Sequence, residues 1–356
     1  MNSLRCRACG SPDLDHRGTK AGTFLRRDFD FHRCRACELM FVEPFSGFAI
    51  YDDAYYRGQG PDPYVDYETE YRDWRRTDRA HEFADLFRLA EKRLRAQATK
   101  APHPPPPFPG PSVRDPLALG PSSPAPSAPS TPASGSAPLS LEPLVLHTSS
   151  ASLSPAPLRW LDFGCGAGGF LKFLREKNTL AGRPLALTGH DVGSYATLLK
   201  SQDGFRILDL DEIRREPAAS FDVISLIEVI EHLPEPVPPL ERIARLLKPG
   251  GLLLLTTGNL DSPAARRSGI HYRYCVPEIH VSLFTPRTLA RLYDRVGLTP
   301  YPVRFDGAVR FKVLKTLRHR PVLLGLARAA LALPPVVRAI DAAYGVSAMP
   351  CAVKPA

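Results

Sequence analysis

Two cysteine pairs near the beginning of the chain have the spacing of a metal site. Cys6 and Cys9 form one CxxC turn, and Cys34 and Cys37 form a second, with 24 residues between the pairs. Two such turns can place four thiolates around one tetrahedral Zn²⁺ ion. Because a segment of about 40 residues buries too little apolar surface to fold alone, the metal would supply the missing stability. We therefore expect a structural zinc ribbon over residues 1–45.

A second candidate site is the glycine-rich stretch WLDFGCGAGGF, which contains an apolar run and then four glycines. Gly164-x-Gly166-x-x-Gly169 fits a dinucleotide loop, whereas Asp162-x-Gly164-x-Gly166-x-Gly168 fits a loop for S-adenosyl-L-methionine. A dinucleotide would bring a pyrophosphate close to the aspartate, at a cost in Coulomb energy. S-adenosylmethionine brings an ammonium and a sulfonium, which a carboxylate attracts. The aspartate therefore favours a methyl donor.

Acidic residues at three further strand ends suit the rest of this donor. Asp191 follows the second expected strand, where a carboxylate can accept hydrogen bonds from both ribose hydroxyls of either cofactor. Asp209 follows the third strand, where it can accept from the adenine amino group while the backbone N–H of Leu210 meets a ring nitrogen. We expect Asp209 in this role and Asp211 as a helix cap. Glu228, in the turn after the fourth strand, is assigned to the same pocket.

A base for methyl transfer is expected at the same edge. An oxygen or carbon acceptor usually requires proton removal, and Glu231 and His232 follow the fourth strand directly. The intrinsic pKa of histidine suits this task. The alternative is that this pair only shapes the cofactor pocket or caps the next helix. His280 is a further candidate base, and His271 and Tyr272 are expected to line the acceptor site.

The elements that must position these residues begin at residue 158. Strands and helices alternate from there, which predicts a parallel sheet with helices on both faces and ligands beyond the carboxyl ends of the strands. The expected strands are 158–163, 185–190, 205–208, 221–227, 251–257 and 298–305. The expected helices are 168–177, 194–202, 237–247 and 286–296.

Two segments precede this α/β region. Residues 46–98 begin with aromatic residues, and Tyr55 and Tyr56 are expected to close over the cleft as a lid or to pack ordinarily against the domain. The segment ends in one charged helix with an apolar stripe, formed by Tyr71, Trp74, Phe83, Phe87, Ala90 and Leu94. Residues 99–157 are rich in Pro, Ser and Ala and show no periodicity. They bury too little surface to offset their ordering entropy, so we expect a disordered linker.

Three motifs, LDFGCGAGG, SFDVISLIEVIEHL and LKPGG, together resemble those of the class I S-adenosylmethionine-dependent methyltransferases. The resemblance covers 158–305 and implies a Rossmann-like α/β sheet with strand order 3-2-1-4-5-7-6. The last strand, which runs antiparallel, is expected within 345–355, so the methyltransferase domain would span 158–356. The block before that strand, 309–342, is then an insertion.

A narrower resemblance concerns the segments outside the glycine loop. CRACELMFVEP, YDDAYYRGQGPDPYVDYETEY and PEIHVSLFTPRTLARLYDRVGL look like a methyltransferase subgroup with an N-terminal zinc-binding ribbon. Members of that subgroup often act on nucleotide-linked sugars or other small biosynthetic intermediates. This sequence departs from them in its 99–157 insertion and lacks the large extra C-terminal domain of the sugar C-methyltransferases. The resemblance implies a small hydroxylated metabolite as acceptor.

The net positive charge and the apolar stretches of the sequence indicate which partners the protein could bind. The formal net charge is +9, and several arginines lie close to the cysteine pairs. RNA bound by the ribbon is therefore the alternative acceptor. The insertion combines an apolar stretch with basic residues: Arg310, Lys312, Lys315, Arg318 and Arg320. We expect a helical pair that covers the active site, with peripheral membrane contact through 309–337 as the alternative. Since the sequence shows no 18-residue apolar run and no secretory leader, we expect a cytoplasmic protein.

Overall fold

The computed structural model describes residues 4–62, 67–77, 79–99, 155–303, 313–314, 317, 319–344 and 350–356. Met1–Ala98 and Pro155–Ala356 cluster into one compact unit. The predicted linker lies almost entirely outside the described residues, and so do Arg310, Lys312, Lys315 and Arg318 of the insertion.

The main sheet has the predicted strand order. From edge to edge its strands are β7 (Arg206–Leu208), β6 (Arg183–His190), β4 (Leu158–Phe163), β8 (Phe221–Ile227), β9 (Leu247–Thr256), β12 (Cys351–Val353) and β11 (Thr299–Tyr301). When the strands of this sheet are numbered in chain order from β4, leaving out the short β5, the order is 3-2-1-4-5-7-6. The strand β10 belongs to another sheet and is not counted. The strand β12 runs antiparallel between β9 and β11. The sequence did not predict β5 (Thr179–Leu180), which forms a hairpin with β6.

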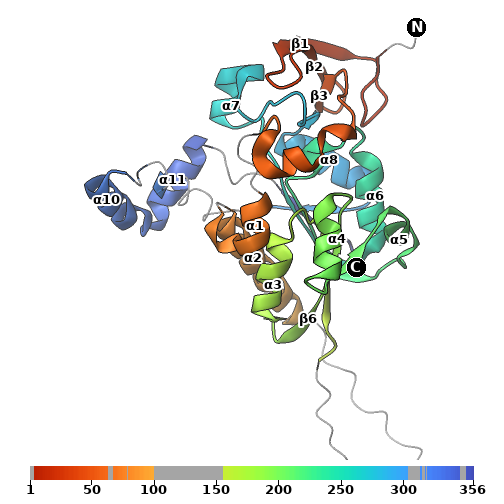
Figure 1. Ribbon diagram of the computed structural model, residues 1–356, viewed down its shortest axis with the longest axis vertical. Coiled ribbons are helices and arrows are strands. Elements are labelled where there is room, and N and C mark those ends of the chain that lie inside the picture. The colour runs from red at the N-terminus through yellow and green to blue at the C-terminus, as the bar shows by residue number, and fades with distance from the viewer. Residues whose placement is uncertain are drawn as a thin grey trace, which may run out of the picture. The chain divides into compact units, whose positions relative to one another are not determined.

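Helices cover both faces of this sheet because successive side chains of a strand point to opposite sides. Trp160 of β4 packs in one core with α2 (Ala80–Ala98) and α3 (Gly169–Lys177). Leu161, the next residue, packs in the opposite core with α5 (Leu210–Arg215), α6 (Val237–Leu246) and α8 (Pro286–Arg295) (Figure 1). The helix α4 (Ser194–Ser201) adds Leu199 to a smaller cluster under β7.

The prediction of one continuous helix through residues 71–94 is wrong. The segment divides into α1 (Tyr67–Asp73), a 3₁₀ turn over Trp74–Arg76, and α2. Asp73 accepts a hydrogen bond from the backbone N–H of Arg75, and the Thr77 hydroxyl donates to the carbonyl of Trp74. Such side-chain bonds to the backbone compete with helix continuation. The aromatic stripe still packs on the domain, since Trp74 meets Phe173 edge-to-face.

The N-terminal segment forms a second sheet, which includes a strand from the methyltransferase region. The strands β1 (Leu14–Ala21), β2 (Asp28–Cys34) and β3 (Met40–Glu43) are antiparallel, and β10 (Ser282–Leu283) pairs with β3. Arg291 on α8 also donates to the carbonyl of Ala36. The ribbon is therefore joined to the catalytic region by backbone pairing, which the sequence did not predict.

The remaining described elements are short turns and three helices. The turns are Phe48–Ile50, Tyr55–Gln59, Ile230–His232 and Gly269–His271, and the helices are α7 (Pro263–Ser268), α10 (Pro321–Leu331) and α11 (Pro334–Tyr344). A helical pair thus occupies the described part of the predicted insertion, and α11 contacts α7. That the pair covers the active site stays a prediction. Among the described residues no single helix is long and apolar enough to cross a membrane, although α10 and Pro334–Ile340, bent by 107°, satisfy the length and composition together.

Candidate active site

The glycine loop leads from β4 into α3 through a backbone that glycine favours. Gly164, Gly166 and Gly168 all have positive φ values, of 79°, 51° and 76°. The backbone N–H groups of Gly164 and Cys165 donate to the carbonyl of His190, at 2.7 and 3.1 Å. This holds the loop against the end of β6. A side chain at Gly164 would also collide with Val229, so larger residues are excluded.

Asp162, the residue that favours a cationic donor, lies buried beside this loop. It is 2% exposed, and the hydroxyl of Ser225 donates to its carboxylate at 2.6 Å. Burial raises the pKa of this carboxyl to about 7. A carboxylate with so little water around it is stabilised when a cation binds nearby. The residue therefore fits a ligand that carries an ammonium group.

Asp191 lies where β6 ends, and its carboxylate is held by the loop. One oxygen accepts from the N–H of Gly166 at 2.8 Å and the other from the N–H of Gly193 at 2.7 Å. A carboxylate oxygen can accept more than one hydrogen bond, so these contacts orient the group and leave capacity for hydroxyl donors. The position suits the predicted ribose contact.

Asp209 caps a helix, which corrects the assignment of that role to Asp211. Its carboxylate accepts from the backbone N–H groups of Asp211 and Glu212, and Glu212 accepts in return from the N–H of Asp209. This capping box begins α5 immediately after β7. Leu210, whose backbone was predicted to meet the adenine ring, has a side chain that is 46% exposed. The strand end is thus rigid, and the adenine contact stays a prediction.

Tyrosines from the 46–98 segment pack over the glycine loop. The ring of Tyr67 occupies the space that a side chain at Gly166 would need, and the hydroxyl of Tyr56 lies against Gly193. The two rings pack edge-to-face with centroids 5.1 Å apart, and Tyr195 of α4 lies next to Tyr56 at 6.1 Å. These contacts fit both a lid and ordinary packing against the domain, so the lid stays a prediction.

Arg79 is a residue of the site that the sequence did not single out. It pairs with Glu70 at 3.6 Å and with Glu82 at 3.5 Å, and it donates to the carbonyl of Ile227 at the end of β8. Its buried Nε atom is the one that faces Glu82 in the 3.5 Å ion pair, without the geometry of a hydrogen bond. The pattern RRTDRA offered three arginines, and only burial separates this one from its exposed neighbours Arg75 and Arg76.

The predicted bases Glu231, His232 and His280 come together at the carboxyl end of β8. One carboxylate oxygen of Glu231 accepts from the hydroxyl of Thr257 at 2.8 Å, and the other accepts from Tyr274 at 2.5 Å. The Tyr274 hydroxyl also lies 3.0 Å from Glu228. Burial raises the pKa of Glu231 to about 7, and burial with repulsion from Glu231 raises that of Glu228 to about 8. Thr257 and Tyr274 had not been predicted.

The two histidines face each other with ring centroids 5.0 Å apart. Nδ1 of His280 lies 2.6 Å from the carbonyl oxygen of Tyr274, and Nδ1 of His232 lies 3.1 Å from that of Ile279 and 2.9 Å from the hydroxyl of Tyr51. Because a carbonyl only accepts, we assign the proton of each neutral ring to Nδ1. Burial lowers the pKa of His232 to about 4 and that of His280 to about 3. Both rings are therefore neutral near pH 7, with a lone pair on Nε2.

Glu231, His232 and His280 each offer one ligand atom within 4.8 Å of the others, so this group could hold a metal ion as well as a proton. His271 and Tyr272 do not join it. His271 is exposed, and Tyr272 packs in a cluster with Phe29 of the ribbon instead. The structure therefore places them outside the base cluster, whereas Tyr274, two residues further on, donates its hydroxyl to Glu231.

The four predicted zinc ligands lie together in the ribbon. Cys6 and Cys37 have sulfur atoms 3.5 Å apart, as do Cys9 and Cys34, and all four sulfur atoms lie within 4.8 Å of one another. Thiolates about 2.3 Å from a tetrahedral zinc ion are separated by roughly 3.8 Å. All four cysteines are free of disulfides. The donor set and its spacing fit one structural zinc ion.

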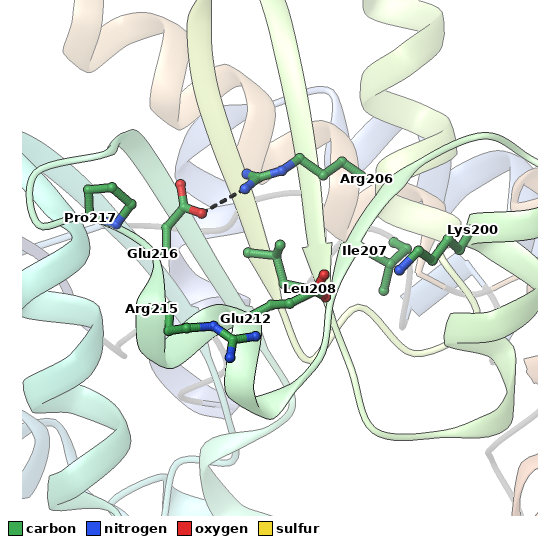
Figure 2. A pocket seen from close by; sticks show the side chains of 8 residues that line it. All are labelled: Lys200, Arg206, Ile207, Leu208, Glu212, Arg215, Glu216 and Pro217. Carbon is green, nitrogen blue, oxygen red and sulfur yellow. Dashed lines mark hydrogen bonds and ion pairs between the residues drawn. The ribbon is translucent and has the colours of Figure 1, made fainter.

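A hollow of about 320 Å³ lies at the β7 edge of the sheet, between β7 and α5. Figure 2 shows its lining, in which Arg206 and Glu216 form an ion pair at 2.7 Å. The lining contains none of the predicted cofactor or base residues. The candidate active site is therefore defined by the side chains at the ends of β4, β6 and β8.

Comparisons with known proteins agree with this fold and loop. Residues 139–303 match the family model described as "Methyltransferase domain". The chain thus contains a methyltransferase domain, and the predicted resemblance to the class I S-adenosylmethionine-dependent enzymes is confirmed.

Part of the chain is similar to curated relatives. The chain is 36% identical over 132 residues to a ubiquinone biosynthesis O-methyltransferase of Xanthomonas axonopodis pv. citri, covering 35% of this chain and 53% of that protein. It is 34% identical over 129 residues to the protein of the same name from Marinobacter nauticus, covering 33% and 52%. The chain spans about half the length of these curated relatives. Among solved structures, Haemonchus contortus phosphoethanolamine N-methyltransferase 2 with S-adenosyl-L-methionine is 18% identical, with 56% and 49% coverage and a TM-score of 0.36.

Proposed function

We propose that this protein transfers a methyl group from S-adenosylmethionine to a small hydroxylated metabolite, such as a nucleotide-linked sugar or another biosynthetic intermediate. The observation that carries the proposal is the buried Asp162 beside a positive-φ glycine loop. Such a carboxylate attracts a cationic donor and repels a pyrophosphate. The relatives named for O-methylation support a hydroxyl acceptor.

Four groups of the chain would hold the donor. Asp162 attracts its ammonium group, Asp191 accepts from its ribose hydroxyls, and Asp209 with the backbone of Leu210 meets its adenine. Arg79, whose guanidinium reaches the carbonyl at the end of β8, would meet its carboxylate. When bound, S-adenosylmethionine supplies a methyl carbon on a positively charged sulfur, and the chain must hold an acceptor in line with it.

The proton of the acceptor hydroxyl is taken by the cluster of Glu231, His232 and His280. Of these three, His232 is the half-buried one, so we assign it the contact with the acceptor. Its neutral ring can accept a hydrogen bond or a proton on Nε2, and the nearby Glu231 carboxylate stabilises the imidazolium that forms. His280 and Tyr274 hold the pair in place.

The arginines of the ribbon give less support to RNA as the acceptor. Arg7 pairs with Glu43 at 2.6 Å, and Arg33 pairs with Glu38 at 3.4 Å. Arg35 lies 3.7 Å from Asp13. Because these acidic partners offset much of the positive charge, the ribbon offers a weaker field for phosphates than the sequence suggested.

Incubation with radiolabelled S-adenosylmethionine and separated cell fractions tests the function. We expect label in the small-metabolite fraction, and we expect Asp162→Asn to lower it by about tenfold or more when the donor is below saturation. Asp28→Asn, an exposed aspartate on β2, serves as the matched control and should retain labelling. Label that appears only in the RNA fraction would contradict the proposal, and so would full labelling by Asp162→Asn.

A further inference from the structure

The helical pair α10–α11 leaves an apolar stripe uncovered. Val322 is 75% exposed, Leu323 42%, Leu326 64% and Leu333 56%. Residues 322 and 326 are four apart and share one side of α10, and Leu333 lies in the bend that follows the helix. Leu331 and Val337 form the buried side, against each other. The pair therefore has a small core of its own and a separate outward apolar stripe.

The sequence around this stripe is strongly basic, with Asp341 of α11 as the acidic residue of the helical pair. Residues 307–340 contain no Asp or Glu and seven basic residues: Arg310, Lys312, Lys315, Arg318, Arg320, Arg328 and Arg338. Arg320 immediately precedes α10, Arg328 lies on α10 and Arg338 lies on α11, and all three are exposed. An uncovered apolar face bordered by cations is complementary to an anionic lipid surface. A second copy of the same face would bring the like charges of Arg320, Arg328 and Arg338 together instead, which disfavours self-association.

The length of each helix and the bend between them suit an interfacial position. Eleven residues of α10 extend about 16 Å, roughly half the thickness of a bilayer core. The second helix turns away at 107°. Apolar side chains on such short helices can enter the boundary between headgroups and acyl chains, while arginines remain at the phosphates.

We propose that the α10–α11 pair binds the surface of an anionic membrane, with Val322, Leu323, Leu326 and Leu333 inserted and the three exposed arginines at the lipid phosphates. This contact is independent of the methyl-transfer chemistry, because none of its residues belongs to the glycine loop or the base cluster. It would hold the enzyme at the bilayer surface.

Vesicle flotation of the full chain tests this directly. Vesicles of phosphatidylcholine alone should not carry the protein, whereas vesicles that also contain phosphatidylglycerol should, with weaker binding at high salt. The double variant Val322→Ser/Leu326→Ser keeps the charge and should lower the partition coefficient about tenfold or more. Arg320→Gln/Arg328→Gln should lower it by a similar factor.

A matched control lies in the ribbon, where Phe24 and Leu25 are 49% and 39% exposed beside Arg26 and Arg27. Phe24→Ser/Leu25→Ser should float as the unchanged protein does. The proposal is overturned if Val322→Ser/Leu326→Ser keeps full flotation, because the net charge alone would then explain adsorption. It is also overturned if that variant only converts a dimer to a monomer in sedimentation. Circular dichroism and donor calorimetry on each variant separate these outcomes from misfolding and from failure of the methyltransferase assignment.

Discussion

The ionised side chain of Asp162 destabilises the free protein, and a bound cationic donor would stabilise it. Its pKa rises from 3.8 to about 7 because the carboxyl is buried. A folded-state pKa above the unfolded one favours folding at pH below about 4, and this contribution is lost as the pH rises through 7. Near pH 8 the ionised, buried group therefore costs up to about 4 kcal/mol in the free protein. A cationic donor offsets that cost on binding.

Replacing this carboxylate should therefore raise stability while it removes function. We expect Asp162→Asn to increase the melting temperature of the free protein at pH 8, with a difference that narrows towards pH 4. Donor affinity should fall by about tenfold or more, since an opposite charge next to the ammonium is lost. Thermal denaturation at both pH values and calorimetry measure the two effects. A variant that melts lower at pH 8 yet binds the donor normally would show that Asp162 is only a structural residue.

The base cluster makes a separate prediction about rate. We expect His232→Ala to lower kcat by about a hundredfold or more, because general-base catalysis contributes about that factor. Donor affinity should remain close to that of the unchanged protein. His271→Ala, an exposed histidine near the ribbon, is the matched control and should retain kcat. Equal kcat values for His232→Ala and His271→Ala would show that His232 is not the general base.

At the scale of elements, the sequence predicted the strands whose apolar pattern is local. The strands 158–163 and 221–227 have the predicted bounds, and the order of the main sheet follows from the resemblance. The pairing of β10 with β3 was not predictable, because a two-residue strand has no pattern and its partner lies far away in sequence. The break after Asp73 was missed because the apolar stripe continues across it.

Some residues of the candidate site could be predicted from the sequence and others could not. Glu231 and His232 could be found because they follow a buried strand directly. Tyr274, Thr257 and Arg79 reach the same place from other segments, and only the fold brings them together. Asp209 caps α5, although Asp211 had been predicted to do so. The two differ by two residues, and helix propensity alone does not fix a helix boundary that closely.

The pairing of β3 with β10 predicts that the zinc ribbon affects activity at a distance. The strand β10 begins two residues after His280, so loss of the ribbon should loosen the base cluster. We expect Cys9→Ser to release zinc and to lower kcat about tenfold or more, as weakened ligand support typically does. Metal analysis and kinetics measure both changes. Cys275→Ala, a cysteine outside the ribbon, should keep its zinc; normal kcat in zinc-free Cys9→Ser would contradict the coupling.

At the scale of the whole molecule, the two flanks of 99–154 form one unit. Phe83 and Leu86 of α2 pack in one core with Trp160 of β4, on the other side of that insertion. We expect replacement of 100–154 by a short Gly/Ser linker to leave the melting temperature and donor affinity nearly unchanged, because loop-closure entropy varies slowly with length. A loss of donor binding in this variant would show that the segment belongs to the methyltransferase unit rather than linking its parts.

Isothermal titration calorimetry with two ligands tests the central claim most directly. The purified chain is titrated with S-adenosylmethionine and, separately, with NAD⁺ under the same conditions. We predict saturable heat with the sulfonium donor, near one ligand per chain, and no saturable heat with the dinucleotide. Tight binding of NAD⁺ together with no heat from S-adenosylmethionine would contradict the account.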